Sequence, residues 1–142
     1  MAIYTSFVHL ESSGFGDIMD ITKDAVDALR ESGIRNGIMT LFVPGSTGSI
    51  TTIEYEEGVV EDLKDALERL IPSRIPYGHD IKWGDGNGFS HVRAALMGPG
   101  ITLPIVNGNI LIGTWQQIVL IDHDNRQRSR KVRIQIIGEC ES

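Results

Sequence analysis

The segment TLPIVNGNILIGTWQQIVLID, residues 102–122, limits the possible folds more than any other part of the chain. Asn107 and Gly108 tolerate the positive φ angles of a type I′ turn, and apolar and β-branched residues flank them. This pattern predicts a β-hairpin, and residues 130–138 predict one more strand with alternate apolar residues on one face. Strands grouped in this way at the end of a chain favour an α+β fold over a doubly wound parallel sheet.

The rest of the chain favours the same class. Apolar and β-branched runs predict strands at 2–11, 15–19, 37–44 and 50–56, with the second strand as the hairpin partner of the first. Apolar stripes at helical spacing predict two main helices, within 20–33 and 56–72, and one short helix over 89–98. Residues 73–87 read as a long irregular loop, which in a compact domain is often functional. The 142 residues contain no linker or repeat, so we expect a single domain over 1–142 with a mixed, mostly antiparallel sheet.

Charge and cysteine content exclude several classes of protein. The net charge is −6 and the pI is about 5.1, whereas a general nucleic-acid binder carries a basic face, so we expect no nucleic-acid partner. The single cysteine, Cys140, allows neither an internal disulfide nor a thiolate zinc cluster, which favours a cytoplasmic protein. No apolar run approaches the ~20 residues of a membrane helix, so we expect no membrane partner.

The glycine-rich stretch before His91 is the first candidate site. In WGDGNGFSHV the glycines let a ligand approach the backbone, and the helix that follows offers free N–H groups to an anion. Asp85, Asn87 and Gly88 would then contact a phosphate while His91 faces the same space. The alternative is a plain loop with a helix cap.

His79 lies at the other edge of the same loop, in PYGHD. A neutral imidazole is the commonest nitrogen ligand of zinc and related metals, so His79 and His91 are candidate metal ligands or acid–base groups. Asp80 and Asp85 could complete the site or orient a histidine. The spacing matches no strong metal signature, and two hydrogen-bonded structural histidines are the alternative.

Two further polar segments could bind an anion. Ser46 and Thr47, in VPGSTGS, offer hydroxyl groups beside two glycines, although the segment also suits a simple hairpin loop. Arg126, Arg128 and Arg130 alternate in DNRQRSRK and would point to one side of an extended chain. They could clamp a phosphate, or they could lie on a solvated edge strand.

Three residues near the ends of strands complete the set. Trp115 and Gln116 are expected in a strand, with Trp115 in the core or at a subunit interface and Gln116 facing a ligand. Glu54 could act as a general base or a metal ligand. The other two histidines, His9 and His123, are expected to be structural.

These segments also carry a resemblance. FVPGSTGSITTIEYE, PYGHD and DGNGFSHVRAALMGPGITLPIVNGNILIGTWQQIVLIDHDNRQR, in this order, resemble the YjbQ-like family across nearly the whole chain. The resemblance implies a sheet curled toward a half-barrel, a homotrimer, and a metal or anion site that includes His79 and His91. It also places Glu54, Trp115 and Gln116 at family positions. Some members are described as secondary thiamine-phosphate synthase enzymes.

This chain departs from the family pattern at Gly45, where many members have histidine. The departure removes a possible third ligand or catalytic base, and it makes Mg²⁺ held by carboxylates and phosphate more plausible relative to Zn²⁺. The leading hypothesis is an enzyme that acts on a phosphorylated small molecule with a divalent metal. A regulatory protein that binds a metabolite or metal without chemistry, and a metal-dependent hydrolase, are the alternatives.

Overall fold

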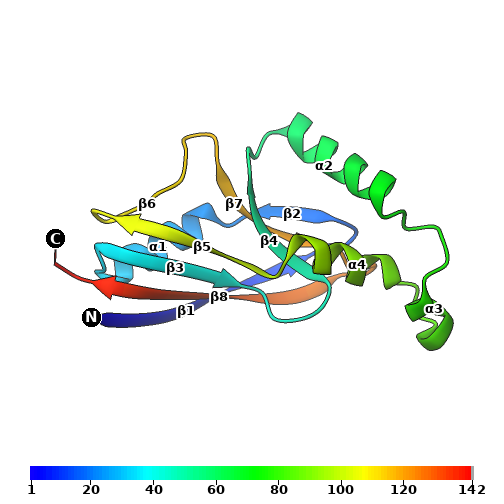
Figure 1. Ribbon diagram of the computed structural model, residues 1–142, viewed down its shortest axis with the longest axis horizontal. Coiled ribbons are helices and arrows are strands. Elements are labelled where there is room, and N and C mark those ends of the chain that lie inside the picture. The colour runs from blue at the N-terminus through cyan, green and yellow to red at the C-terminus, as the bar shows by residue number, and fades with distance from the viewer. Residues whose placement is uncertain (142) are drawn as a thin grey trace.

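The computed structural model describes residues 1–141, and its strands form two antiparallel sheets (Figure 1). The five-stranded sheet has the order β1-β8-β3-β5-β6, and the three-stranded sheet has the order β2-β7-β4. The strands are β1 Ala2–Ser12, β2 Asp17–Asp20, β3 Asn36–Phe42, β4 Gly48–Ile53, β5 Gly100–Val106, β6 Asn109–Ile110, β7 Gln117–Asp122 and β8 Arg128–Glu139. The helices are α1 Thr22–Ser32, α2 Glu57–Leu70, α3 Gly78–Trp83 and α4 Gly88–Met97. The predicted single α+β domain with a curled, half-barrel sheet is confirmed, and every strand pairing within residues 1–141 is antiparallel.

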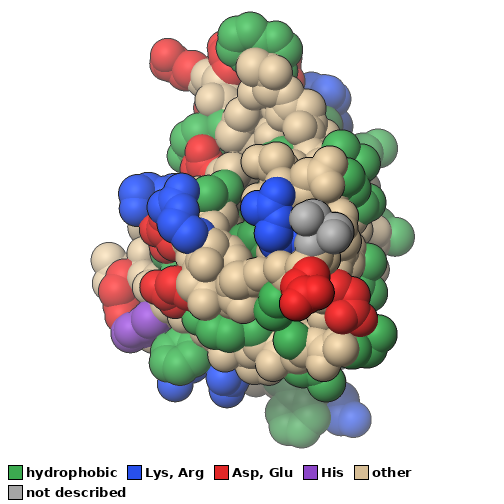
Figure 2. Space-filling view, turned by 90° about the vertical axis from the view of Figure 1, so that its left-hand side faces the viewer, with side chains coloured by type: hydrophobic (Ala, Val, Ile, Leu, Met, Phe, Trp, Pro, Cys, Tyr) green, Lys and Arg blue, Asp and Glu red, His purple; other side chains and the backbone are tan. Residues whose placement is uncertain are grey.

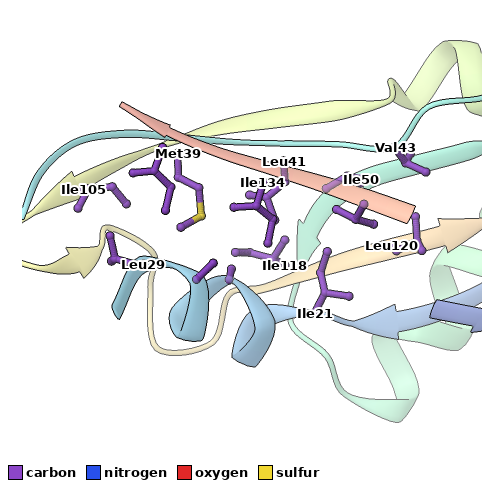
Figure 3. Close-up of a cluster of buried hydrophobic side chains, with 14 of the residues drawn as sticks. Ile21, Leu29, Met39, Leu41, Val43, Ile50, Ile105, Ile118, Leu120 and Ile134 are labelled. Carbon is purple, nitrogen blue, oxygen red and sulfur yellow. The ribbon is translucent and has the colours of Figure 1, made fainter. Parts of the chain in front are cut away.

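The core lies between the inner face of the large sheet, helix α1 and strands β4 and β7 (Figure 3). Alternate residues of a strand point to one face, so β8 directs its even-numbered side chains inward, and Val132, Ile134 and Ile136 are fully buried. Met39 and Leu41 of β3 pack beside them, opposite Ile118 and Leu120 of β7. Each such side chain contributes about 1.5–3 kcal/mol by leaving water.

Strand β2 does not form a hairpin with β1, and this part of the prediction is wrong. Strand β1 pairs with β8 along its whole length, and β2 pairs with β7 in the other sheet. Gly14, Phe15 and Gly16 all have positive φ angles, of 72°, 55° and 79°. This run redirects the chain from one sheet to the other instead of closing a two-stranded ribbon.

The predicted turn at Asn107 and Gly108 is confirmed, but the strands that it joins differ from those expected. Both residues have positive φ angles, and β5 pairs with β6 around them. Beyond β6 the chain crosses to the other sheet, where β7 lies between β2 and β4. Trp115 and Gln116 therefore lie in the crossing segment and not in a strand, and Trp115 is 73% exposed. Of the two positions expected for Trp115, the core of this chain is wrong, and a subunit interface stays a prediction.

The stretch 73–87, predicted to be irregular, contains helix α3. Gly84, with a φ angle of 72°, ends the helix in the left-handed conformation. Strand β4 ends at Ile53, so Glu54 lies just beyond the strand that was predicted to hold it. None of the helices within residues 1–141 has both the length and the apolar character needed to cross a bilayer.

Candidate functional site

The structure brings His79 and His91 side by side. Helices α3 and α4 contact each other, and the two imidazole rings have their centroids 4.3 Å apart with a tilt of 48°. The Nε2 atom of His79 lies 2.9 Å and 3.1 Å from the two carboxylate oxygens of Asp85. Asp85, predicted to contact the ligand, therefore also holds the ring of His79 in place.

Glycines in the α3–α4 connection make this approach possible. Gly84 and Gly86 have φ angles of 72° and 70°, which let the chain reverse within a few residues. A Cβ atom on Gly88 would lie 2.5 Å from Cβ of Tyr77, so only glycine lets the two helices pack this closely. The N–H of Gly88 donates to Asp80 at 2.8 Å, which ties the start of α4 to α3. Gly88 is thus a packing residue, and its N–H is already used inside the protein.

A hollow of about 320 Å³ lies beside His91. Gly45, Ser46 and Gly48 form one wall, and Ala94, Ala95 and Pro99 complete it with His91. Ser46 is exposed at the mouth of this hollow. Thr47 is buried, and its hydroxyl donates to Asp124 at 3.0 Å and accepts from Arg130 at 2.7 Å. The hydroxyl of Thr47 is therefore used inside the protein and does not face the hollow.

A cluster of buried polar side chains packs against the inner side of the loop formed by residues 45–48. Arg130 is 3% exposed, and its Nε and Nη2 atoms donate to the two oxygens of Asp122 at 2.9 and 2.8 Å. Arg128 pairs with Asp124, which also accepts from Nδ2 of Asn87 at 3.2 Å. The Oδ1 atom of Asn87 is buried and has no hydrogen-bond partner within residues 1–141.

Both acids of this cluster stay ionised. Burial alone would raise the pKa of Asp122, but hydrogen bonds from Arg130 and from the backbone N–H of Asp124 outweigh it and hold this pKa below its usual value. Burial would likewise raise the pKa of Asp124, and hydrogen bonds from Asn87, the N–H of Asn125, Thr47 and Arg128 lower it.

His123 is the neutral member of the cluster. It is fully buried, and burial lowers its pKa to about 4, with the nearby Arg93 cation as a second cause. Its Nε2 atom lies 2.9 Å from the hydroxyl oxygen of Ser49, and its Nδ1 has no partner among the described residues. The expected structural role of His123 agrees with this position.

The three arginines that were predicted to clamp a phosphate lie in three different environments. Arg126 is exposed and precedes β8, while Arg128 is half-buried and paired with Asp124. Arg130, which was weighed only as a member of the series, lies under the wall of the hollow. The sequence contains a signal for this burial. Alternate residues of a strand share one face, so Arg130 must face inward together with Val132 and Ile134.

Glu54 and Gln116 lie away from the histidines in this chain. Glu54 lines a second hollow, of about 350 Å³, together with Asp20, Tyr55, Glu56, Thr114, Trp115 and Gln117. The Gln116 side chain bonds to Thr52 and to the N–H of Gly113. Gly48 and Glu54 are at opposite ends of β4, so about 20 Å of strand separates the two hollows.

The predicted metal ligands form an incomplete set. Within residues 1–141 no three side chains of His, Cys, Asp or Glu surround a common metal position. His79 and His91 supply two imidazoles, whereas a catalytic zinc has three protein ligands. The residues of one chain therefore do not fit a closed zinc site.

The fold and the hollow define an α+β domain with a curled antiparallel sheet and, at the edge of its second sheet, a mostly apolar pocket in which His91 and Ser46 are the polar lining residues. Residues 7–139 match the family model described as UPF0047 protein YjbQ-like, and the chain belongs to this family.

Relatives of known sequence and structure cover almost the whole chain. A UPF0047 protein of Methanothermobacter thermautotrophicus is 37% identical over 139 residues, which span 98% of this chain and 95% of that protein. A UPF0047 protein of Mycobacterium tuberculosis is 34% identical, over 85% of this chain and 96% of its own length. The crystal structure of a YbjQ-like protein of unknown function from Sulfolobus solfataricus superimposes with a TM-score of 0.93 at 28% identity, covering 97% of this chain and 99% of that one.

Proposed function

We propose that this protein is a cytoplasmic enzyme that binds a phosphorylated small molecule in the hollow beside His91. The observation that carries the proposal is the contact between the imidazoles of His79 and His91, next to a glycine-rich wall. An imidazole is the side chain best suited to transfer a proton near neutral pH. Glycine walls and exposed N–H groups suit phosphate oxygens.

The two histidines would have different roles in the chemistry: His79 would hold His91 in position, and His91 would transfer the proton. Asp85 orients His79, and His79 in turn packs on His91, which lines the hollow. In this proposal His91 would donate a proton to an oxygen of a departing phosphate or remove one from an attacking group. Joining a pyrimidine diphosphate to a thiazole phosphate, the reaction of thiamine-phosphate synthase, has these needs, because pyrophosphate must leave. We include it as a candidate side activity.

A divalent cation, Zn²⁺ or Mg²⁺, belongs to the proposal as a ligand that arrives with the substrate. His79 and His91 would be its protein ligands, and phosphate oxygens or a neighbouring subunit would fill the remaining positions. When bound, such a cation would supply positive charge to the phosphate. Zinc titration by calorimetry, with and without phosphate, tests this part: binding that requires phosphate supports it, and no binding in either case removes it.

The test of the function compares phosphate binding and turnover in wild type and His91→Ala. We expect wild type to bind phosphorylated compounds and to convert one of them, and His91→Ala to lose turnover by about 10²-fold or more, the usual contribution of a general acid or base. The fold of the variant is checked by its unfolding temperature. A fully active His91→Ala would exclude the assigned role.

One observation favours a non-catalytic alternative. Of the seven residues that line the hollow, only Ser46 and His91 have side chains that can exchange a proton. A protein that senses a phosphorylated metabolite needs no more than this. Binding without product, across a panel of pyrimidine and thiazole phosphates, would support the sensor.

A further inference from the structure

We propose that Arg130 is the group that recognises the anion in the His91 hollow, and that Gly45 is the opening through which a phosphate oxygen reaches it. This inference rests on the proposed function, because it assigns the phosphate contact at the same site. It differs from the sequence prediction, which gave the contact to Arg126 and Arg128.

Three nitrogen atoms of the Arg130 side chain have different surroundings. Nε and Nη2 both donate to Asp122, and Nη2 also donates to Thr47. Nη1 makes no hydrogen bond within residues 1–141, and it is not among the fully buried polar atoms that lack a partner. Nη1 therefore retains contact with solvent although the residue is 3% exposed.

The glycines of the 45–48 loop show where Nη1 points. A Cβ atom on Gly45 would lie 3.2 Å from Nη1, and a Cβ atom on Gly48 would lie 3.7 Å from Cζ of the same guanidinium. Both glycines line the hollow beside His91. At these two positions the wall has no side chain that could stand between the hollow and the guanidinium, and any larger residue at position 45 would narrow the passage from the hollow to Nη1.

The two other arginines of the series are poorly placed for this task. Arg128 is engaged with Asp124, and Arg126 is exposed on the segment before β8. Of these three arginines, Arg130 is the one whose Nε and Nη2 are both held by hydrogen bonds while its Nη1 makes none within residues 1–141. A donor fixed in this way loses little freedom when it binds, which is the advantage of a preorganised site.

The charges around Arg130 define the kind of anion contact. Arg128 and Arg130 face Asp122 and Asp124, so the cluster is balanced while both acids are ionised, and His123 adds no charge at neutral pH. Arg130 therefore supplies a directed hydrogen bond to one oxygen rather than a surplus positive charge. The remaining phosphate oxygens would face His91 and solvent, which suits a phosphate monoester whose organic part extends out of the hollow.

The test follows the arginine side chains of ¹⁵N-labelled wild-type protein by NMR during titration with inorganic phosphate. The Arg130 signals are assigned through bonds from the backbone, so no Arg130 variant is needed. We expect them to shift and saturate with phosphate, and not with chloride at the same ionic strength, while the signals of Arg126 stay unchanged.

A matched pair of variants tests the opening. Gly45→Ala places a methyl group beside Nη1 and should weaken phosphate binding by about tenfold, the loss of one charge-assisted hydrogen bond. Gly33→Ala also places alanine at a positive φ angle, of 70°, but its Cβ meets nothing within 4 Å and lies outside the hollow, so this variant should bind phosphate like wild type. Unfolding temperatures report the strain that a φ angle of 114° imposes on alanine at position 45.

The outcomes separate this inference from the proposed function. If wild type binds phosphate and His91→Ala does not, but the Arg130 signals stay still and Gly45→Ala binds normally, Arg130 is not the contact and the proposed function stands. If wild type binds no phosphate or phosphate ester at all, both fail. If Gly45→Ala does not fold, the response of Arg130 in wild type decides.

Discussion

At the scale of single residues, the buried cluster beneath the hollow combines charged and neutral groups that titrate differently. His123 is fully buried with a pKa of about 4, so it is neutral in the folded protein at neutral pH. Asp122 and Asp124 have pKa values below the usual range and remain charged. As pH falls, the stability of the cluster therefore changes first through protonation linked to His123. Protonation of Asp122 and Asp124 affects it only at lower pH.

His123 gives a prediction about stability and pH. As pH falls below 6.5, the unfolded chain takes up a proton at His123 while the folded protein does not, so the free energy of unfolding decreases until about pH 4. The expected loss is about 3 kcal/mol. Urea unfolding at several pH values measures it, and the His123→Gln variant should lack this part of the slope. Parallel curves for the two proteins would contradict the burial of a neutral histidine.

Arg130 and Asp122 give a second prediction. Arg130→Met leaves Asp122 buried without its partner and should lower the free energy of unfolding by about 3–5 kcal/mol. Arg130→Met combined with Asp122→Leu removes both charges and should recover most of that loss. Denaturant titrations measure the free energy of unfolding of both variants. An equal decrease in the two would show that the loss does not come from leaving Asp122 without its ion-pair partner.

At the scale of elements, the pairing of α3 with α4 positions the candidate site. Neither helix has a long apolar stripe, and α3 contains no buried residue. The two helices are held by the close approach at Gly88, the bond from its N–H to Asp80 and the contact of His79 with His91.

Gly88→Ala tests this arrangement. Its Cβ would overlap Tyr77, so the helices must separate, which should cost about 1–3 kcal/mol and reduce phosphate binding by moving His79 away from His91. Gly78→Ala is the control in the same helix pair, because its Cβ meets nothing within 4 Å and its φ angle is not positive. Thermal unfolding and calorimetry compare the two. Normal phosphate binding by Gly88→Ala would show that the helix contact is not needed.

At the scale of the whole molecule, the outer face of the five-stranded sheet is not covered by any helix of residues 1–141, since α1 packs on the inner face. Ile3 and Phe7 of β1, Ile38 and Phe42 of β3, and Val106 of β5 are between 42% and 68% exposed there. At the end of the molecule that carries the termini, by contrast, acidic, basic and apolar side chains are interspersed (Figure 2). Charged side chains share this face, since Lys131 and Arg133 of β8 lie over the ring of Phe7. A surface that combines apolar and aromatic residues with arginine is typical of a subunit interface.

We predict a homotrimer on this basis together with the family resemblance. Analytical ultracentrifugation should give three times the 15.6 kDa mass of the chain. Ile38→Glu should shift the protein toward monomers, whereas Leu111→Glu, an exposed residue in the segment after β6, should not. A monomeric wild type would rule out the trimer, and a trimer that tolerates Ile38→Glu would place the interface elsewhere.

Local pattern was sufficient for the type and approximate position of most elements. The turn at Asn107 and Gly108 follows from residues that accept positive φ angles, and the buried face of β8 follows from its alternation. Helix α3 was missed because its six residues bury nothing and therefore carry no apolar period. The proximity of His79 and His91 was expected from the loop between them, whose glycines allow a tight reversal.

By itself, the sequence determined the hairpin turn and the main helices, because each depends on neighbours within about a dozen residues. The order of strands and helices along the chain indicated the α+β class, and His79 and His91 were expected at the two edges of one loop. Only the tertiary structure decided the pairing of β2 with β7, the separation of Glu54 from His91, and the position of Arg130 beneath Gly45. Those features join segments far apart in the chain: Gly45 and Arg130 are separated by 85 positions, and the paired residues Asp17 and Asp122 by 105. Local propensity does not encode which distant strands meet, since that choice depends on how all the apolar faces are buried together.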